Sequence, residues 1–377
     1  MIVIASLAAG CSFSSNSAKT DGNTQHDGSG SGSGSAVIDA AVDAPPDGPV
    51  MDFGPAPFTV HLSALPTAPV TLPAMINTDT SNLCSTTASW GSSTQPDACF
   101  VVGTSIASSG GMTTVTGSKP IVLLATTTIS LTKTIDASSR RATNVGPAAN
   151  YSQCTVFVNT PGAGNGGGGG GGAGGTFMTQ GGPGGGGDNG TANGGSAPTP
   201  GSSPTILRGG CIGQKGGTAN SGAPGNGGGA IYLIAAQSIS IAANIGINAS
   251  GAGANHGMHA SGGSGAGSGG MIMFYAPSIS ATGGILIANG GGGASGGDTN
   301  TDGRDGGDTP GAMTPAQGGI GPGGNGGNGA ILTAAGDSGG GGTSNEAGGG
   351  GGGGVGYIRS NVTLTGAIAS PAPDVVP

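Results

Sequence analysis

The stretch GGGAIYLIAAQSISIAANIGINASGAGA, residues 227–254, constrains the fold most, because it places strand-like alternation between runs of glycine. In SISI, residues 238–241, serine and isoleucine alternate, so an extended strand would turn its isoleucines to one side and its serines to the other. Apolar residues recur at every second position, and no convincing amphipathic-helix spacing occurs in the chain. The sequence therefore predicts an all-β fold of short strands.

This arrangement recurs along the chain. The segments that start at residues 230 and 271 each hold a longer apolar strand and two shorter ones, and related copies lie at 121–138 and 355–370. One such unit buries too few aliphatic side chains to offset the entropy of ordering it, so units should stack on one another. We therefore expect a short parallel β-helix, or solenoid, with long glycine-rich insertion loops. Further strands are expected at Phe58–Leu62, Phe100–Val102, Met112–Thr116, Ile121–Ala125 and Thr128–Leu131.

Glycine supplies 89 of the 377 residues, whereas charged residues make up 7% and aromatic residues 3%. Any core must therefore be thin and built from isoleucine, valine, leucine and alanine. The glycine-rich loops are expected to be flexible, or to pack side by side as extended threefold helices of the polyproline II kind, and to be partly ordered at best. The alternative is that the whole low-complexity region is disordered, against which the matched register of the copies argues.

The N-terminal sequence MIVIASLAAGCSFSS has the form of a bacterial lipoprotein signal, in which residues 1–11 end at a lipid-modified Cys11. No lysine or arginine precedes the apolar run, and the alternative is a chance run of small residues before an inert cysteine. The run is too short to span a bilayer as a helix.

The composition changes along the rest of the chain. Residues 12–57 are rich in Gly, Ser, Pro and Asp and are expected to form a disordered tether. We expect N-terminal β coils over 58–160, glycine-rich β-solenoid repeats over 161–370 and a C-terminal tail over 371–377.

Four cysteines remain once Cys11 is set aside: Cys84, Cys99, Cys154 and Cys211. In an exported chain they suggest two disulfides, and three connectivities are open. Cys84–Cys99 with Cys154–Cys211 closes the shortest loops, and free buried thiols are the alternative.

The stretch GGDTNTDGRDGGD, residues 296–308, carries oxygen ligands on a turning loop, as a calcium site requires. The candidate ligands are Asp298, Asn300, Asp302, Asp305 and Asp308. Thr309 stands where an EF-hand loop has glutamate, so a solvated acidic stretch without a cofactor is the competing interpretation. His256 and His259 lie three residues apart, and no acid or cysteine near them in sequence completes a metal site.

Catalysis has little support in the sequence. The HExxH and Walker patterns are absent, and acids are sparse. Asp136, Arg140 and Arg141 form the one mixed charged cluster inside the repeats, where a turn cap and solvent-exposed arginines are the simpler roles. We therefore assign no catalytic residues and expect no enzymatic activity.

Five segments carry a resemblance: AAGC at 8–11, DAAVDAPPDGP at 39–49, KPIVLLATTTISLTKTIDASSRR at 119–141, LRGGCIGQKGG at 207–217 and the closing GGGGGVGYIRSNVTL. With them the chain resembles the glycine-rich predicted surface lipoproteins abundant in myxobacteria. The resemblance covers most of the chain and implies a lipid anchor in the outer membrane, with which Ser12 after Cys11 agrees.

These features predict a non-enzymatic, surface-exposed lipoprotein with a structural or adhesive role in the cell envelope, facing the exterior or the periplasm. Its expected partners are the membrane, through the anchor, and a surface polysaccharide or protein. The net charge of −8, with nine basic residues, excludes a nucleic acid partner. The alternatives are a carbohydrate-binding or carbohydrate-cleaving β-helix, which clustered charged and aromatic residues on one face would favour, and a calcium-ordered surface module.

Overall fold

The computed structural model describes residues 51–376, except residues 109, 155 and 165–166. The described residues belong to one compact unit. The predicted signal peptide with Cys11, and the predicted tether up to residue 50, lie outside them. Residues 51–57, which we predicted as the end of the disordered tether, are part of the fold, and strand β1 (Met51–Phe53) lies among them.

Three of the four sheets formed by the described residues are parallel, and each takes corresponding strands from successive units. The first has the order β16 (Ser278–Ser280), β13 (Ser238–Ile241), β10 (Thr128–Leu131), β7 (Ile106–Ser108) and β3 (Val70–Leu72). The second has the order β19 (Ile368–Ser370), β17 (Ile285–Ile287), β14 (Gly246–Asn248), β11 (Ile135–Asp136), β8 (Thr113–Thr116) and β4 (Met75–Asn77).

The third parallel sheet carries the longest strands, in the order β20 (Asp374–Val375), β18 (Tyr357–Ser360), β15 (Met271–Tyr275), β12 (Ala230–Ala235), β9 (Ile121–Ala125) and β6 (Cys99–Gly103). The fourth sheet is antiparallel and joins β1, β2 (Val60–Leu62) and β5 (Ala88–Trp90). A single short 3-10 helix, η1 (Asp188–Gly190), accompanies the sheets among the described residues.

The register places like side chains above one another. Leu123 of β9 pairs with Leu233 of β12, which in turn pairs with Phe274 of β15, and all three are buried. They belong to an aliphatic core shared by the three parallel sheets. The other face of the third sheet forms a second apolar cluster, in which Tyr232 packs with Phe58 and Leu62 of the N-terminal segment. Burial of this aliphatic surface is the main contribution that stabilises the sheets.

The prediction of a short parallel β-helix with long glycine-rich insertion loops is wrong. The structure has four sheets, three parallel and one antiparallel, and none of them is closed. The chain leaves the sheets for long excursions between β11 and β12, between β14 and β15, and between β17 and β18, so its strands do not form one continuous winding. In the last copy no strand forms at 362–365, and β20 lies in the predicted tail.

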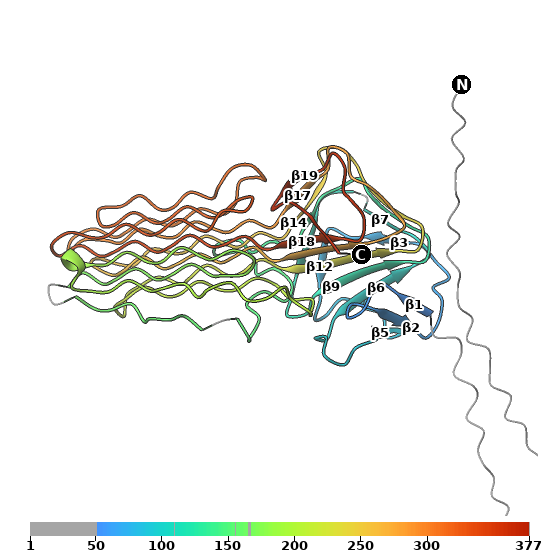
Figure 1. Cartoon of the computed structure of the whole chain (residues 1–377), viewed down its shortest axis with the longest axis horizontal. Coiled ribbons are helices and arrows are strands. Elements are labelled where there is room, and N and C mark those ends of the chain that lie inside the picture. The colour runs from blue at the N-terminus through green and yellow to red at the C-terminus, as the bar shows by residue number, and fades with distance from the viewer. Residues whose placement is uncertain (1–50, 109, 155, 165–166, 377) are drawn as a thin grey trace, which may run out of the picture. The chain divides into compact units, whose positions relative to one another are not determined.

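The glycine-rich excursions run as long extended segments beside one another, away from the sheets (Figure 1). Their backbone hydrogen bonds recur at every third residue. Three N–H groups donate to one neighbouring segment: Gly169 to Ala260, Gly172 to Gly263 and Gly175 to Ala266. A repeat of three residues per turn is that of the polyproline II helix, which has no internal hydrogen bonds and therefore offers every N–H to a neighbour. We call this assembly the glycine bundle.

Segment 347–356 lies in the middle of the glycine bundle, and all its residues are buried. Its N–H groups donate to three neighbouring segments, 169–175, 288–297 and 337–340, except that of Val355, which donates to Thr179 Oγ1. The positions that its Cβ atoms would occupy point at three others, 179–185, 264–270 and 325–328. A Cβ on Gly351, for example, would overlap the carbonyl oxygen of Gly182. Six neighbours at this distance leave room for glycine alone at residues 348–354. The expectation of loops that are partly ordered at best is wrong for the described residues.

Candidate functional site

The acids of the predicted calcium loop lie on the side of the glycine bundle, where Asp305 is the centre of a charged cluster. Its Oδ1 accepts hydrogen bonds from the backbone N–H of His256, at 2.9 Å, and lies 2.7 Å from the Nδ1 of the same residue. Its Oδ2 accepts a hydrogen bond of 2.5 Å from Nη1 of Arg141. The sequence gives no signal for this pairing, because Arg141 precedes Asp305 by 164 residues.

Burial alone would raise the pKa of the Asp305 carboxyl. The two hydrogen bonds from His256 and the charge of Arg141 outweigh that effect and hold the pKa below its ordinary value. Asp305 is therefore an ionised acceptor that ties the segment holding His256 to the residues after β11.

The other predicted ligands serve the backbone in the same way. Asp308 Oδ1 accepts hydrogen bonds from the N–H groups of Arg141 and Gly253, at 3.0 and 2.9 Å. Asp302 accepts the N–H of His259 at 2.7 Å. Carboxylates at these places satisfy N–H groups of neighbouring segments that would otherwise lack an acceptor.

Asp298 and Asn300 lie in an exposed turn. The N–H groups of Asn300 and Thr301 both donate to Asp298 Oδ1, and these bonds lower the pKa of that carboxyl. The described residues contain no group of three or more His, Cys, Asp or Glu side chains suited to a metal ion. The five calcium candidates are thus spread over several hydrogen-bonding roles, and the calcium site stays a prediction.

A cleft of about 490 Å³ lies beside this charged cluster and is lined by Arg141, Asn220, Asn255, His256 and Asp305, among others. Two of its buried polar atoms, Arg141 Nε and Asn255 Oδ1, have no hydrogen-bond partner in the part of the chain that the structure describes. One is a donor and the other an acceptor. The cleft therefore presents an unpaired hydrogen-bond donor and an unpaired acceptor to a ligand at one place on the glycine bundle.

The remaining charged cluster is structural in its contacts. Asp136 is buried, and its Oδ1 accepts both the N–H and the hydroxyl of Ser138, while its Oδ2 pairs with Arg140 at 2.9 Å. A carboxylate that caps a turn and binds one arginine matches the turn-capping role expected for Asp136. Arg140 and Arg141 differ from the expectation, because both form ion pairs rather than lying free in solvent.

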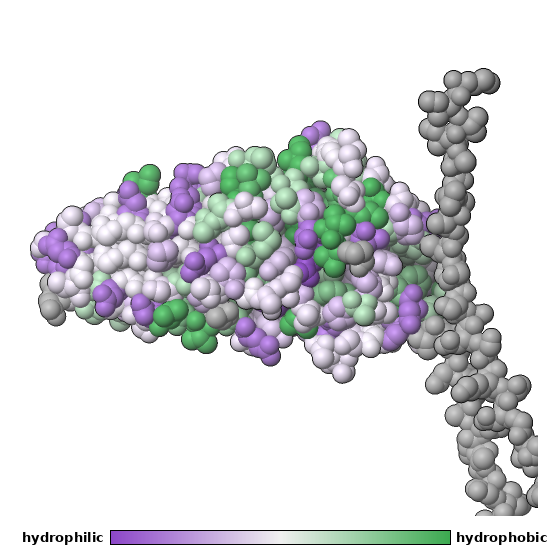
Figure 2. All heavy atoms as spheres, viewed as in Figure 1, coloured by the Kyte–Doolittle hydropathy of each residue, from purple (hydrophilic) through white to green (hydrophobic). Residues whose placement is uncertain are grey.

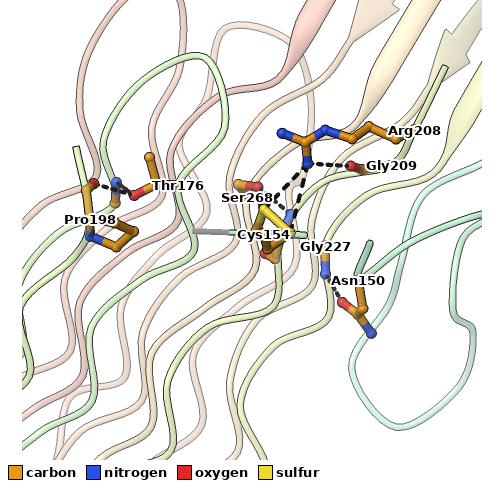
Figure 3. The surroundings of a disulfide bond; sticks show 10 residues. Asn150, Cys154, Thr176, Pro198, Arg208, Gly209, Gly227 and Ser268 are labelled. Atoms are coloured by element: carbon orange, nitrogen blue, oxygen red, sulfur yellow. Dashed lines mark hydrogen bonds between the residues drawn. A yellow bond between two sulfur atoms is a disulfide. The ribbon is translucent and has the colours of Figure 1, made fainter. Parts of the chain in front are cut away.

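The structure pairs Cys84 with Cys99 and Cys154 with Cys211, which is the connectivity with the shortest loops. Arg208 lies over the second disulfide, with Nη1 at 3.7 Å from Cys154 Sγ and 3.6 Å from Cys211 Sγ (Figure 3). Its guanidinium stacks over the Phe177 ring at 4.1 Å, and burial lowers its pKa. The sequence did not identify Arg208 as a contact of this disulfide. Its one hint is the position of Arg208 near Cys211 in the stretch LRGGC.

No protein-family description, no curated protein and no solved structure matches this chain. Within the described residues, no helix has the length and apolar character needed to cross a bilayer.

Proposed function

We propose that this chain is a non-enzymatic surface protein of the cell envelope with a structural or adhesive role, held at the outer membrane by a lipid on Cys11. The glycine bundle carries the proposal. Because its inner segments pack on one another through backbone atoms, the bundle has few side chains that could hold a substrate, and such an assembly suits a stiff spacer.

The outward face of the first parallel sheet supports the same interpretation. Its exposed or half-buried positions are hydroxyl-bearing residues in register across three strands: Thr128, Ser238 and Ser278 in one row, and Ser130, Ser240 and Ser280 in the next. A polysaccharide-cleaving β-helix would need clustered carboxylates and basic groups on such a face. Small hydroxyl side chains favour contact with a hydrated surface instead.

The anchor is tested in cells that express the full chain. Wild type should incorporate labelled palmitate and fractionate with the outer membrane, whereas Cys11→Ser should do neither. Incorporation of label by Cys11→Ser to the wild-type level would contradict the anchor.

The structural or adhesive role is tested with two glycine substitutions. Gly351→Ala breaks the packing of the glycine bundle, whereas a Cβ on Gly341 would meet nothing nearer than Gly186 O, at 3.6 Å. Cells carrying Gly351→Ala should lose retention on a coated surface under flow, and cells carrying Gly341→Ala should keep it. If both variants retained cells like wild type, at equal amounts of surface protein, the role would be refuted.

The polar cleft favours one second candidate, the binding of a carbohydrate. A saccharide hydroxyl can donate to Asn255 Oδ1 and accept from Arg141 Nε, the two atoms without partners. Calorimetric titration of the full chain with oligosaccharides should give saturable binding that Asn255→Ala weakens. The exposed Asn345→Ala, at the far end of the glycine bundle, is the matched control. Equal heats from wild type and Asn255→Ala would exclude this cleft as the site.

A further inference from the structure

A second cavity lies on the outer face of the third sheet and has a volume of about 260 Å³. Its lining includes Tyr232, Met273 and Tyr275 from β12 and β15, together with Pro57 and Phe58 from the segment before β2. Residues 203–205 and Arg359 also line it, and the remaining lining residues are Pro55, Ala56, Phe274, Ser360, Asn361 and Val376. Because proline, methionine and aromatic side chains dominate, the cavity suits an apolar ring or short chain better than a sugar.

Arg359 is the charged group of this cavity and is only 6% exposed. Its Nη1 donates to Pro204 O at 2.9 Å, its Nη2 donates to Ser203 Oγ, and its guanidinium lies 4.9 Å from the centre of the Tyr357 ring. Its Nε has no partner among the described residues, and no carboxylate among them forms an ion pair with it. A buried cation without a counter-ion is costly, and an anion bound beside it removes that cost.

Tyr232 supplies a second unsatisfied group to the same lining. The side chain is fully buried, and its Oη has no hydrogen-bond partner in the described part of the chain. Burial raises the pKa of the phenol above its ordinary value, so the group stays protonated and remains a donor at neutral pH. The register aligns Tyr232 with Met273 and Met273 with Arg359, so one row across three strands carries both unsatisfied groups.

We propose that this cavity binds a small carboxylic acid that carries an apolar ring or a short alkyl chain. The guanidinium of Arg359 recognises the carboxylate, and the aromatic and methionine side chains enclose the apolar part. Asp374, the next residue in the same cross-strand row, is exposed and places a negative charge near Arg359, where it weakens the attraction for an anion.

The test uses the full chain with ¹³C-labelled methionine methyl groups and benzoate as the probe. Benzoate should shift the Met273 methyl signal in a saturable way and leave that of Met75 in place, since Met75 lies on β4 and is 70% exposed. Benzamide, which has the same ring without the charge, should bind about tenfold more weakly or worse.

Two variants separate recognition of the charge from the integrity of the cavity. Arg359→Gln should weaken benzoate binding, followed at the Met273 methyl signal, by about tenfold or more. Because Arg359 also holds residues 203–204, this variant can disturb the wall. Asp374→Asn is therefore the second variant and should tighten benzoate binding by about twofold to threefold without changing that of benzamide. Any of three results would overturn the proposal. The first is equal affinity for benzoate and benzamide, and the second is a preference for benzoate over benzamide that Asp374→Asn leaves unchanged. The third is an equal shift of the Met273 and Met75 methyl signals.

Discussion

The parallel sheets and the glycine bundle solve the same physical problem in different ways. Both must pair backbone N–H and C=O groups that are removed from water. The sheets do so in ladders whose side chains alternate, and residues such as Leu233 and Ile239 then fill a shared core. In segment 347–354 the N–H groups donate in succession to three neighbouring segments, and hardly any side chains remain to be packed. The comparison teaches that a buried interior needs close contact, which glycine provides by bringing backbones together.

The two regions should therefore respond oppositely to changes in side-chain size. A core built from aliphatic side chains is damaged when atoms are removed, because a cavity remains. A packed set of backbones is damaged when atoms are added, because the neighbours are themselves held by hydrogen bonds and cannot retreat. The predictions below follow this contrast from the largest expected effect to the smallest.

The two disulfides give the largest expected effects, one in each region. Cys84–Cys99 fastens the sheets across a separation of 15 residues, and Cys154–Cys211 fastens the start of the glycine bundle across 57. In the chain-entropy model the longer loop contributes about 4 kcal/mol to the free energy of unfolding and the shorter about 3 kcal/mol. Denaturant unfolding of the two double Cys→Ser variants measures both. A larger loss for Cys84→Ser/Cys99→Ser would show that the unfolded glycine-rich chain does not behave as a free loop.

In the sheets, Leu233→Ala should lower the free energy of unfolding by about 3 kcal/mol, since Leu233 is fully buried between β9 and β15. Denaturant unfolding measures this change, and the dependence of the free energy of unfolding on denaturant concentration should stay the same. Leu65→Ala is the matched control, because Leu65 is 54% exposed, and it should change the value by about 0.5 kcal/mol or less. If Leu233→Ala and Leu65→Ala lowered the free energy of unfolding by similar amounts, the aliphatic core would not be close-packed.

In the glycine bundle, Gly351→Ala should cost about 2–3 kcal/mol, although alanine adds one methyl group. The added Cβ would overlap Gly182 O, and Gly351 is tied by its own N–H to Gly172 O at 2.9 Å. Hydrogen exchange should speed up most at the amides of residues 348–354. Gly341→Ala, where the space is open, should be neutral or slightly stabilising, since alanine restricts the unfolded chain. If Gly351→Ala left the free energy of unfolding unchanged, the segments of the glycine bundle would be able to move apart.

The strands could be predicted from the sequence because alternation is a local signal. Ile121–Ala125 and Thr128–Leu131 were expected as strands, and they have these bounds in the structure. The cysteine spacing likewise included the observed pairing among its three options. In the antiparallel sheet β2 lies within the expected strand Phe58–Leu62, whereas β1 and β5 were missed, since three residues are too few to show a period.

The order in the glycine bundle could not be predicted, because glycine carries no side chain in which a partner could be recognised. Which segment lies beside which depends on contacts such as Gly171 with Gly349, and every such pair looks alike in sequence. The candidate sites share this difficulty. The acids at 298–308 suggested a common ligand, but their hydrogen-bond donors come from segments as distant as Arg141. Tyr232 and Arg359 were counted as strand residues, and their unsatisfied atoms emerge only from packing.

The smallest expected effect concerns the charged cluster that links the glycine bundle to the residues after β11. Asp305→Asn should lower the free energy of unfolding by about 1 kcal/mol at pH 7, because the ionised carboxylate loses its charge-assisted bonds from Arg141 and His256. The folded pKa of Asp305 lies below its unfolded value of about 3.9, so its contribution is complete above that pH and is lost as pH falls through the folded value. The difference between wild type and Asp305→Asn should therefore shrink as pH falls below about 4 and vanish toward pH 2. Asp97→Asn is the control, because Asp97 is an exposed carboxylate on the sheet side, 3.9 Å from the Lys119 ammonium. It should change the free energy of unfolding by less than about 0.5 kcal/mol. A difference for Asp305→Asn that persisted at pH 2 would mean that the side chain acts through its shape and not through its charge.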